Sequence, residues 1–182
     1  MLHLAAQKFN YMKILPVYRV LTYILLPFGA YFGLQALTAM IQVFGNPIFM
    51  LFTFIFACVP IYIFCSFIFL QKGIKNAQPC KKSLRDWIRA NAVVTIIYVF
   101  LGLLAVIGML MFVSDPELFK QALAKFSADQ KTAVPAEITD PRSIQTIKYM
   151  AGIMLALSIV LLVHVILTFR MLKLYKHVFQ VE

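Results

Sequence analysis

The feature that most constrains this chain is the absence of any charged side chain between Arg19 and Lys72. One membrane-spanning helix needs roughly 20 apolar residues, and this stretch is more than twice as long. With 62% hydrophobic residues in a chain of 182, a soluble domain could not bury them all in one core. The runs are apolar on all sides and do not alternate, which favours helices over barrel strands. The sequence therefore predicts an all-α integral membrane protein.

The apolar runs divide into four spans, which we expect to form a four-transmembrane-helix bundle and a single membrane domain, 1–182. Gly45-Asn46-Pro47 is the strong break inside the charge-free stretch, because these residue types favour a turn followed by a new helix. Pro27 and Pro60 fall within the first two spans, where we expect kinks. The approximate bounds of the spans are 20–44, 48–70, 88–113 and 146–170.

Basic residues gather on one side of the predicted membrane. Four crossings place both termini and the loop 71–87 on the same side. These segments and the adjoining helix ends contain twelve Lys and Arg residues and two acidic residues. The opposite side has five basic and five acidic residues, so the whole formal charge of +10 lies on one face. By the positive-inside rule, that face and both termini are cytoplasmic. The four-span design and the lack of an Asn-x-Ser/Thr site suit a bacterial inner (plasma) membrane.

Membrane lipids are the expected partners of this basic face. Lys81, Lys82 and Arg85 lie next to the third span, and each basic residue near an anionic surface contributes about 1 kcal/mol. We expect these three residues to contact anionic headgroups; the alternative is that they only set the topology. The charges are spread over short segments without a groove of stacking aromatic residues, which argues against a nucleic-acid partner.

Two connections and the N-terminus carry helix signals. Ser83 and Asp86 have capping-box spacing at the start of the third helix, and Asp140-Pro141 predicts the start of the fourth. The residues before Pro16 have amphipathic spacing, which predicts a separate short helix on the membrane surface.

The outer loop, 114–143, is expected to hold an amphipathic helix that begins at Asp115. Its apolar stripe could lie on the outer leaflet, cap the bundle or bind a partner. The stripe consists of Phe119, Ala122, Leu123 and Phe126.

Small residues mark candidate sites of close helix packing. Gly29 and Gly33 form a GxxxG motif in the first span, and Gly152 and Ala156 form a similar pair in the fourth. The second span lacks such a motif and is rich in phenylalanine, so we expect it to be peripheral. The motif leaves open an internal contact, a homo-oligomer or a larger membrane complex.

His164 lies in the stretch without Lys, Arg, Asp or Glu from Tyr149 to Phe169, and an ionisable residue at such a depth in a span is a candidate functional residue. It lies at a depth similar to that of Thr95, with Asn91 nearer the surface, so these three could form a polar layer. Gln35 lies on a polar face in the outer half of the first span. A neutral histidine that bonds a neighbouring helix is the alternative for His164. The polar face with Gln35 could line an outward-facing crevice, and the alternatives are hydrogen bonding between helices or simple proximity to the membrane interface.

Little in the sequence supports specific chemistry. It contains no serine-hydrolase elbow, no HExxH zinc motif and no P-loop. Cys58 and Cys65 are separated by about 10 Å along a helix, too far to share a zinc ion. Four-span quinone-linked thiol oxidases are excluded, because the outer loop has no cysteine. We therefore expect no catalytic residue, no metal and no cofactor.

These observations favour a small non-enzymatic membrane protein, an accessory, scaffold or assembly component acting through its bundle and outer loop. The alternative is a subunit of an oligomeric transporter or channel for ions or small molecules, using the polar faces around Gln35 and His164. A membrane redox protein with haem or quinone ranks third, because His164 would need a facing ligand such as a methionine.

Overall fold

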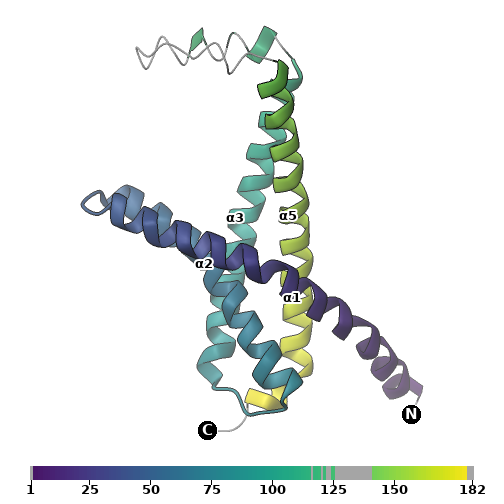
Figure 1. Ribbon diagram of the computed structural model, residues 1–182. Coiled ribbons are helices and arrows are strands. Elements are labelled where there is room, and N and C mark those ends of the chain that lie inside the picture. Colours follow the sequence, from purple (N-terminus) through teal and green to yellow (C-terminus); the bar gives the residue numbers. More distant parts are fainter. Residues whose placement is uncertain (1, 116, 120, 122–123, 126–140, 180–182) are drawn as a thin grey trace. The chain divides into compact units, whose positions relative to one another are not determined.

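The computed structural model describes residues 2–115, 117–119, 121, 124–125 and 141–179 (Figure 1). The secondary structure in these ranges is helical, without a strand. The described residues include four helices long and apolar enough to cross a membrane, which confirms this part of the prediction. They cover Ile14–Gln42, Pro47–Lys75, Lys82–Ser114 and Arg142–Leu174.

The chain divides into two compact units. Unit 1 comprises Met1–Tyr98 and Val160–Glu182, and unit 2 comprises Val99–Ile159. Unit 1 contains helices α1 (Leu2–Gln42) and α2 (Pro47–Ile68), the π-helix η1 (Phe69–Lys75) and the short 3₁₀ helix η3 (Lys176–Phe179). The helices α3 (Lys82–Ser114) and α5 (Pro141–Leu174) each contribute one part to unit 1 and the other part to unit 2.

Helix α1 runs without interruption through Pro16 and Pro27. Its 41 residues give it a length of about 60 Å at 1.5 Å per residue. The prediction of a separate N-terminal helix before Pro16 is therefore wrong. A proline removes one backbone hydrogen bond, and the bonds of the adjoining turns suffice to continue the helix.

The turn between α1 and α2 follows the sequence signal closely. Gly45 has φ of 102°, a conformation that glycine adopts at little cost. The Asn46 side chain accepts a hydrogen bond from the Phe49 N–H group at 3.3 Å and caps α2, whose first residue is Pro47. The predicted turn at Gly45-Asn46-Pro47 is confirmed.

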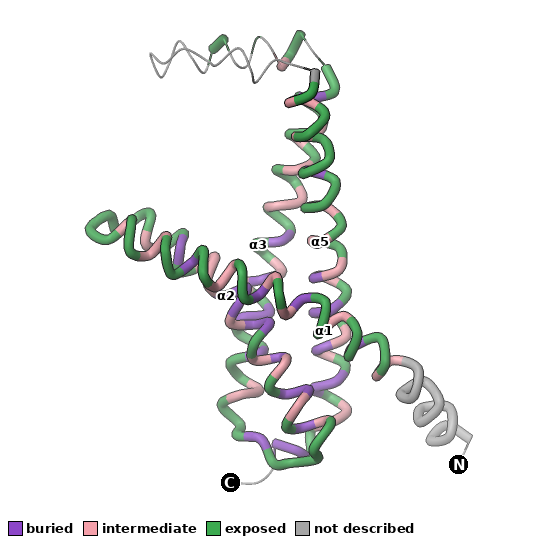
Figure 2. Tube along the Cα trace, in the orientation of Figure 1, coloured by how far each residue is buried: buried purple, intermediate pink, exposed green. Residues whose placement is uncertain are grey.

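Helices α1 and α2 pack closely through the glycine face of α1. A Cβ atom added at Gly29 would lie 2.8 Å from Ile63 Cγ2, and one added at Gly33 would lie 3.6 Å from Pro60 Cβ. Gly29 thus allows the two backbones to approach. Seven residues of α2 are buried, and Figure 2 shows buried residues along this helix, so the expectation that the second span is peripheral is wrong. Branched and ring side chains of α2 fill the space that the glycines leave.

The second span was expected to end near residue 70, but its helix extends to Lys75. The π-helix η1 continues α2 with wider turns. A short loop then leads to α3. Cys80 donates its backbone N–H to the carbonyl of Val178 at 2.9 Å, which attaches this loop to η3. Helix α3 begins at Lys82, so Ser83 already lies inside the helix and does not cap it.

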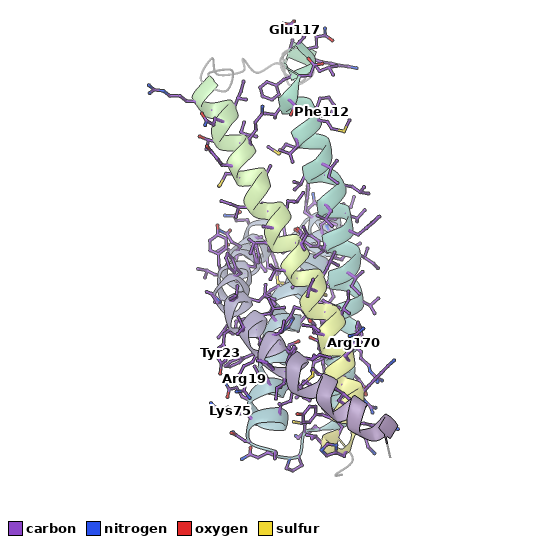
Figure 3. The ribbon with its side chains drawn as sticks, turned by 90° about the vertical axis from the view of Figure 1, so that its right-hand side faces the viewer. Arg19, Tyr23, Lys75, Phe112, Glu117 and Arg170 are labelled. Atoms are coloured by element: carbon purple, nitrogen blue, oxygen red, sulfur yellow. The ribbon has the colours of Figure 1, made fainter. Side chains whose placement is uncertain are left out.

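Unit 2 contains the C-terminal part of α3 and the N-terminal part of α5. At the end of α3, the Asp115 carboxylate accepts hydrogen bonds from the N–H groups of Glu117 and Leu118 at 3.0 and 3.1 Å. Figure 3 labels Phe112 and Glu117 in this region. The helix start predicted at Asp115 therefore has its cap, whereas Ala122, Leu123, Phe126 and Asp140 lie outside the described residues.

Candidate functional site

A layer of buried polar side chains lies in unit 1 and takes one pair from each of its long helices. The members of each pair are four residues apart, so they share one helix face. All eight side chains are buried. The pairs are Tyr18 and Thr22 on α1, Tyr62 and Ser66 on α2, Asn91 and Thr95 on α3, and His164 and Thr168 on α5.

His164 is at the centre of this layer and is 0% exposed. Its Nε2 atom lies 2.9 Å from Thr22 Oγ1 on α1, and its Nδ1 atom lies 2.8 Å from Tyr62 Oη on α2. Tyr62 Oη also lies 2.8 Å from Thr168 Oγ1. One imidazole thus links three helices by hydrogen bonds.

Two tyrosine rings fix the orientation of the imidazole. The Tyr18 ring stacks on it with a centroid distance of 5.1 Å and an interplanar angle of 12°. The Tyr62 ring meets it edge-on at 5.6 Å. The Tyr18 hydroxyl donates to the carbonyl of Ser66 at 3.4 Å, which adds a second link between α1 and α2. Stacking and hydrogen bonding together leave the ring one orientation.

The hydrogen atoms available to these contacts can be counted. Three contacts are those of His164 with Thr22, of His164 with Tyr62, and of Tyr62 with Thr168. In two more, Thr22 donates to the carbonyl of Tyr18 at 2.7 Å, and Thr168 donates to the carbonyl of His164 at 2.8 Å. Five contacts need five hydrogens. Each hydroxyl supplies one, and a neutral imidazole supplies one more, so one contact lacks a hydrogen in either tautomer.

A doubly protonated imidazole would satisfy all five contacts. Nε2–H would donate to Thr22, Nδ1–H would donate to Tyr62, and Tyr62 would donate to Thr168. A buried positive charge without a carboxylate partner is costly, however, and none of these five contacts involves a carboxylate. We infer that the resting ring is neutral and that one of the two threonines alternates between acceptors.

The other residues proposed for a polar site do not join His164 by hydrogen bonds. Asn91 donates to the backbone carbonyl of Trp87 at 2.8 Å. Thr95 is completely buried, and its hydroxyl has no hydrogen-bond partner among the described residues. Gln35 is exposed and donates to Tyr31 Oη at 3.2 Å. The polar layer therefore centres on His164, as the sequence suggested, but the hydrogen-bond partners of His164 are residues that the sequence analysis did not name.

The sequence analysis did not identify the hydroxyl-bearing partners in this cluster, because such residues are common in spans and carry no charge. These partners are Tyr18, Thr22, Tyr62 and Thr168. The available signal was the repeated spacing: each of the four helices has two polar residues four positions apart, near the basic side. Depth counted from the charged ends would then have aligned these pairs.

The residues proposed for helix packing and lipid contact occupy different environments. Gly29 and Gly33 face α2, whereas a Cβ atom at Gly152 would meet nothing within 4 Å, and Ala156 is exposed. The proposed lipid-contact residues also differ from one another. Lys81 lines a groove beside α3, Arg85 Nε donates to Asp86 at 3.3 Å, and Lys82 begins α3.

The arrangement offers no evident metal centre. Within the ranges that the structure describes, no three His, Cys, Asp or Glu side chains are grouped to hold an ion. Cys58, Cys65 and Cys80 are free, although Cys65 and Cys80, which are far apart in sequence, line one groove. No protein-family model, no curated protein and no solved structure matches this chain.

Proposed function

We propose that this protein is a non-enzymatic accessory, scaffold or assembly component of a membrane. The supporting observation is the closed environment of His164, which is fully buried and has both ring nitrogens engaged within the chain. A residue that binds a substrate must be reached from outside, whereas a buried residue that bonds neighbouring helices holds them together. The cluster therefore suits a protein that presents a fixed set of helix faces.

The proposal includes a four-helix bundle with both termini in the cytoplasm and an inner-membrane location. Basic residues from three elements support this orientation: Arg19, Lys75 and Arg170 lie toward the same end of unit 1 (Figure 3). The amphipathic helix expected after Asp115 would lie on the outer surface, on lipid, on the bundle or on a partner. Lipids, a second copy or a larger complex would cover the apolar sides.

The end of the α1–α2 hairpin is the surface that we propose for partner contact. Ile41 is 77% exposed, and Leu37 and Phe44 are exposed beside it. Large apolar side chains of a membrane helix need lipid or another helix against them. This end of the hairpin is removed along the chain from the His164 cluster, so a partner there would leave the cluster intact.

Photo-crosslinking in native membranes tests this proposal. A photoreactive residue at position 41 should capture one protein, or a second copy, in stoichiometric amount, and deletion of the chain should lower the amount of that assembly. The same residue at position 63, which is 1% exposed, provides the control. Capture of lipid alone at position 41, with every membrane complex unchanged after deletion, would refute the proposal.

A transporter or channel subunit is the second candidate, and the hydrogen count around His164 favours it. The cluster has five hydrogen-bond contacts, and its three hydroxyls and the neutral ring supply four hydrogens, so it has a place for one more proton during a transport cycle.

Substitution of His164 separates the two functions. For a scaffold, His164→Leu should lower stability and partner recovery together. Loss of ion or solute flux in reconstituted vesicles that contain equal amounts of folded protein, with partner recovery intact, would favour transport instead. Tyr149→Phe, an exposed change outside the cluster, provides the matched control.

A further inference from the structure

A groove of about 490 Å³ opens beside the basic end of unit 1. Three elements form its walls: the end of α2 with η1, the loop before α3, and the first turns of α3. Its lining includes Ile68, Lys72, Lys81, Ser83, Leu84 and Trp87.

The lining of this groove is divided between charge and apolar surface. Lys72 and Lys81 supply two positive charges, and Ser83 supplies a hydroxyl group. Ile68, Leu84 and Trp87 supply the apolar part, and Trp87 is 58% exposed. No acid is among the lining residues, and nearby Asp86 is paired with Arg85. An anionic group with an apolar extension fits this combination of charges and surfaces.

The loop that carries Lys81 is held in place by η3. Cys80 is 4% exposed, and its backbone N–H donates to Val178 of η3. Lys72 and Cys80 line the same groove; burial raises the pKa of the Cys80 thiol, while the Lys72 ammonium acts to lower it. The two lysines are therefore positioned from different walls of the groove.

We propose that this groove binds the phosphate group of an anionic phospholipid. Lys72 and Lys81 pair with the phosphate, and the Ser83 hydroxyl donates to it. Trp87 and Leu84 contact the glycerol and the start of the acyl chains, since tryptophan favours the headgroup level of a membrane. This site is independent of the scaffold function, which concerns the His164 cluster and the hairpin end.

A membrane lipid is favoured over a soluble phosphate compound by the position of the groove. It lies where one span ends and the next begins, so its apolar residues continue into the lipid-facing surface. The proposal also differs from diffuse attraction of a basic surface to anionic membranes. It assigns binding to Lys72 and Lys81, whereas Lys75, in the same π-helix, does not line the groove.

Trp87 is the single tryptophan of the chain, so its fluorescence reports on this groove directly. The full-length protein in neutral detergent would be titrated with short-chain phosphatidylglycerol, phosphatidylcholine or inorganic phosphate. We expect a saturable change in emission with phosphatidylglycerol. Lys72→Gln and Lys81→Gln should each weaken binding about fivefold, the equivalent of about 1 kcal/mol per basic residue.

Two further variants make the test specific. Lys75→Gln removes a charge of the same sign outside the groove and should leave the midpoint unchanged, and Lys72→Arg keeps the charge and should retain binding. The proposal fails if phosphatidylglycerol gives no saturable change, or if Lys75→Gln weakens binding as much as Lys72→Gln does. An equal midpoint for inorganic phosphate would contradict a lipid ligand and indicate a soluble one.

Discussion

The two units bury different kinds of residue. In unit 1, the described residues include a connected set of buried polar side chains around His164, together with the tight contact between Gly29 and Ile63. In unit 2, the buried residues within the described ranges are Val99, Val113 and Ala151, and none of them is polar. Lipid is as apolar as these side chains, so burial of such surface alone drives little association of helices. Specific contacts, more than apolarity, therefore hold this protein together.

The largest expected effect comes from His164→Leu. This change removes both hydrogen bonds of the imidazole, worth about 1 kcal/mol each, and its stacking on the Tyr18 ring, worth about 0.5–1.5 kcal/mol, at a fully buried position. We expect a loss of about 3 kcal/mol in the free energy of unfolding, measured by titration with a denaturing detergent. Met150→Leu in unit 2, an exposed position, should change it by less than about 0.5 kcal/mol. Equal effects at both positions would remove the distinction between the units.

The same substitution, glycine to alanine, should lower stability in unit 1 and raise it in unit 2. At Gly29 the new Cβ atom would lie 2.8 Å from Ile63 Cγ2, and overpacking of this kind costs about 1–3 kcal/mol. At Gly152 nothing lies within 4 Å, and replacing a helical glycine by alanine there should stabilise by about 0.5–1 kcal/mol. Unfolding titrations of both variants check this pair, and a loss of stability at Gly152 would reveal an unrecognised close contact.

Tyr62→Phe removes a hydroxyl group and keeps the ring. The hydroxyl contacts both His164 and Thr168, and we expect its loss to cost about 1 kcal/mol, the usual net value of a hydrogen bond. Tyr149→Phe in unit 2 removes an exposed hydroxyl that accepts from Gln145 and should cost less. The same unfolding assay measures both. Equal losses would mean that the buried hydrogen bonds add nothing beyond the exposed one.

The smallest effect is expected at Ala77, in the loop before α3. Its φ of 49° is unfavourable for a residue with a Cβ atom, at a cost of roughly 1–2 kcal/mol. Ala77→Gly should relieve part of this strain and raise stability by less than about 1 kcal/mol, because glycine also gains freedom in the unfolded chain. Ala105→Gly, within helix α3 in unit 2, should instead destabilise. A loss of stability at Ala77 would show that this loop is not strained.

The sequence alone predicted four long apolar helices, which the described residues contain, and the turn between the first two. Both depend on local physical chemistry. Charge is costly in lipid, so charge-free runs mark the spans, and the backbone preferences of Gly45, Asn46 and Pro47 mark the turn. The sequence also singled out His164, since an ionisable residue in a span is rare. It failed for the N-terminal helix and for α2, where proline and phenylalanine content were weaker guides than packing.

The partners of His164 were decided only by the tertiary structure. Thr22 and Tyr62 are more than one hundred positions away along the chain, and no local pattern states which helix faces another or in what register. The same holds for the groove, where Lys72 and Lys81 meet through a π-helix and a loop attached to η3. Transfer into lipid depends on each segment by itself and is readable from composition. Helix pairing depends on the fit of two distant surfaces, which exists only after the chain has folded.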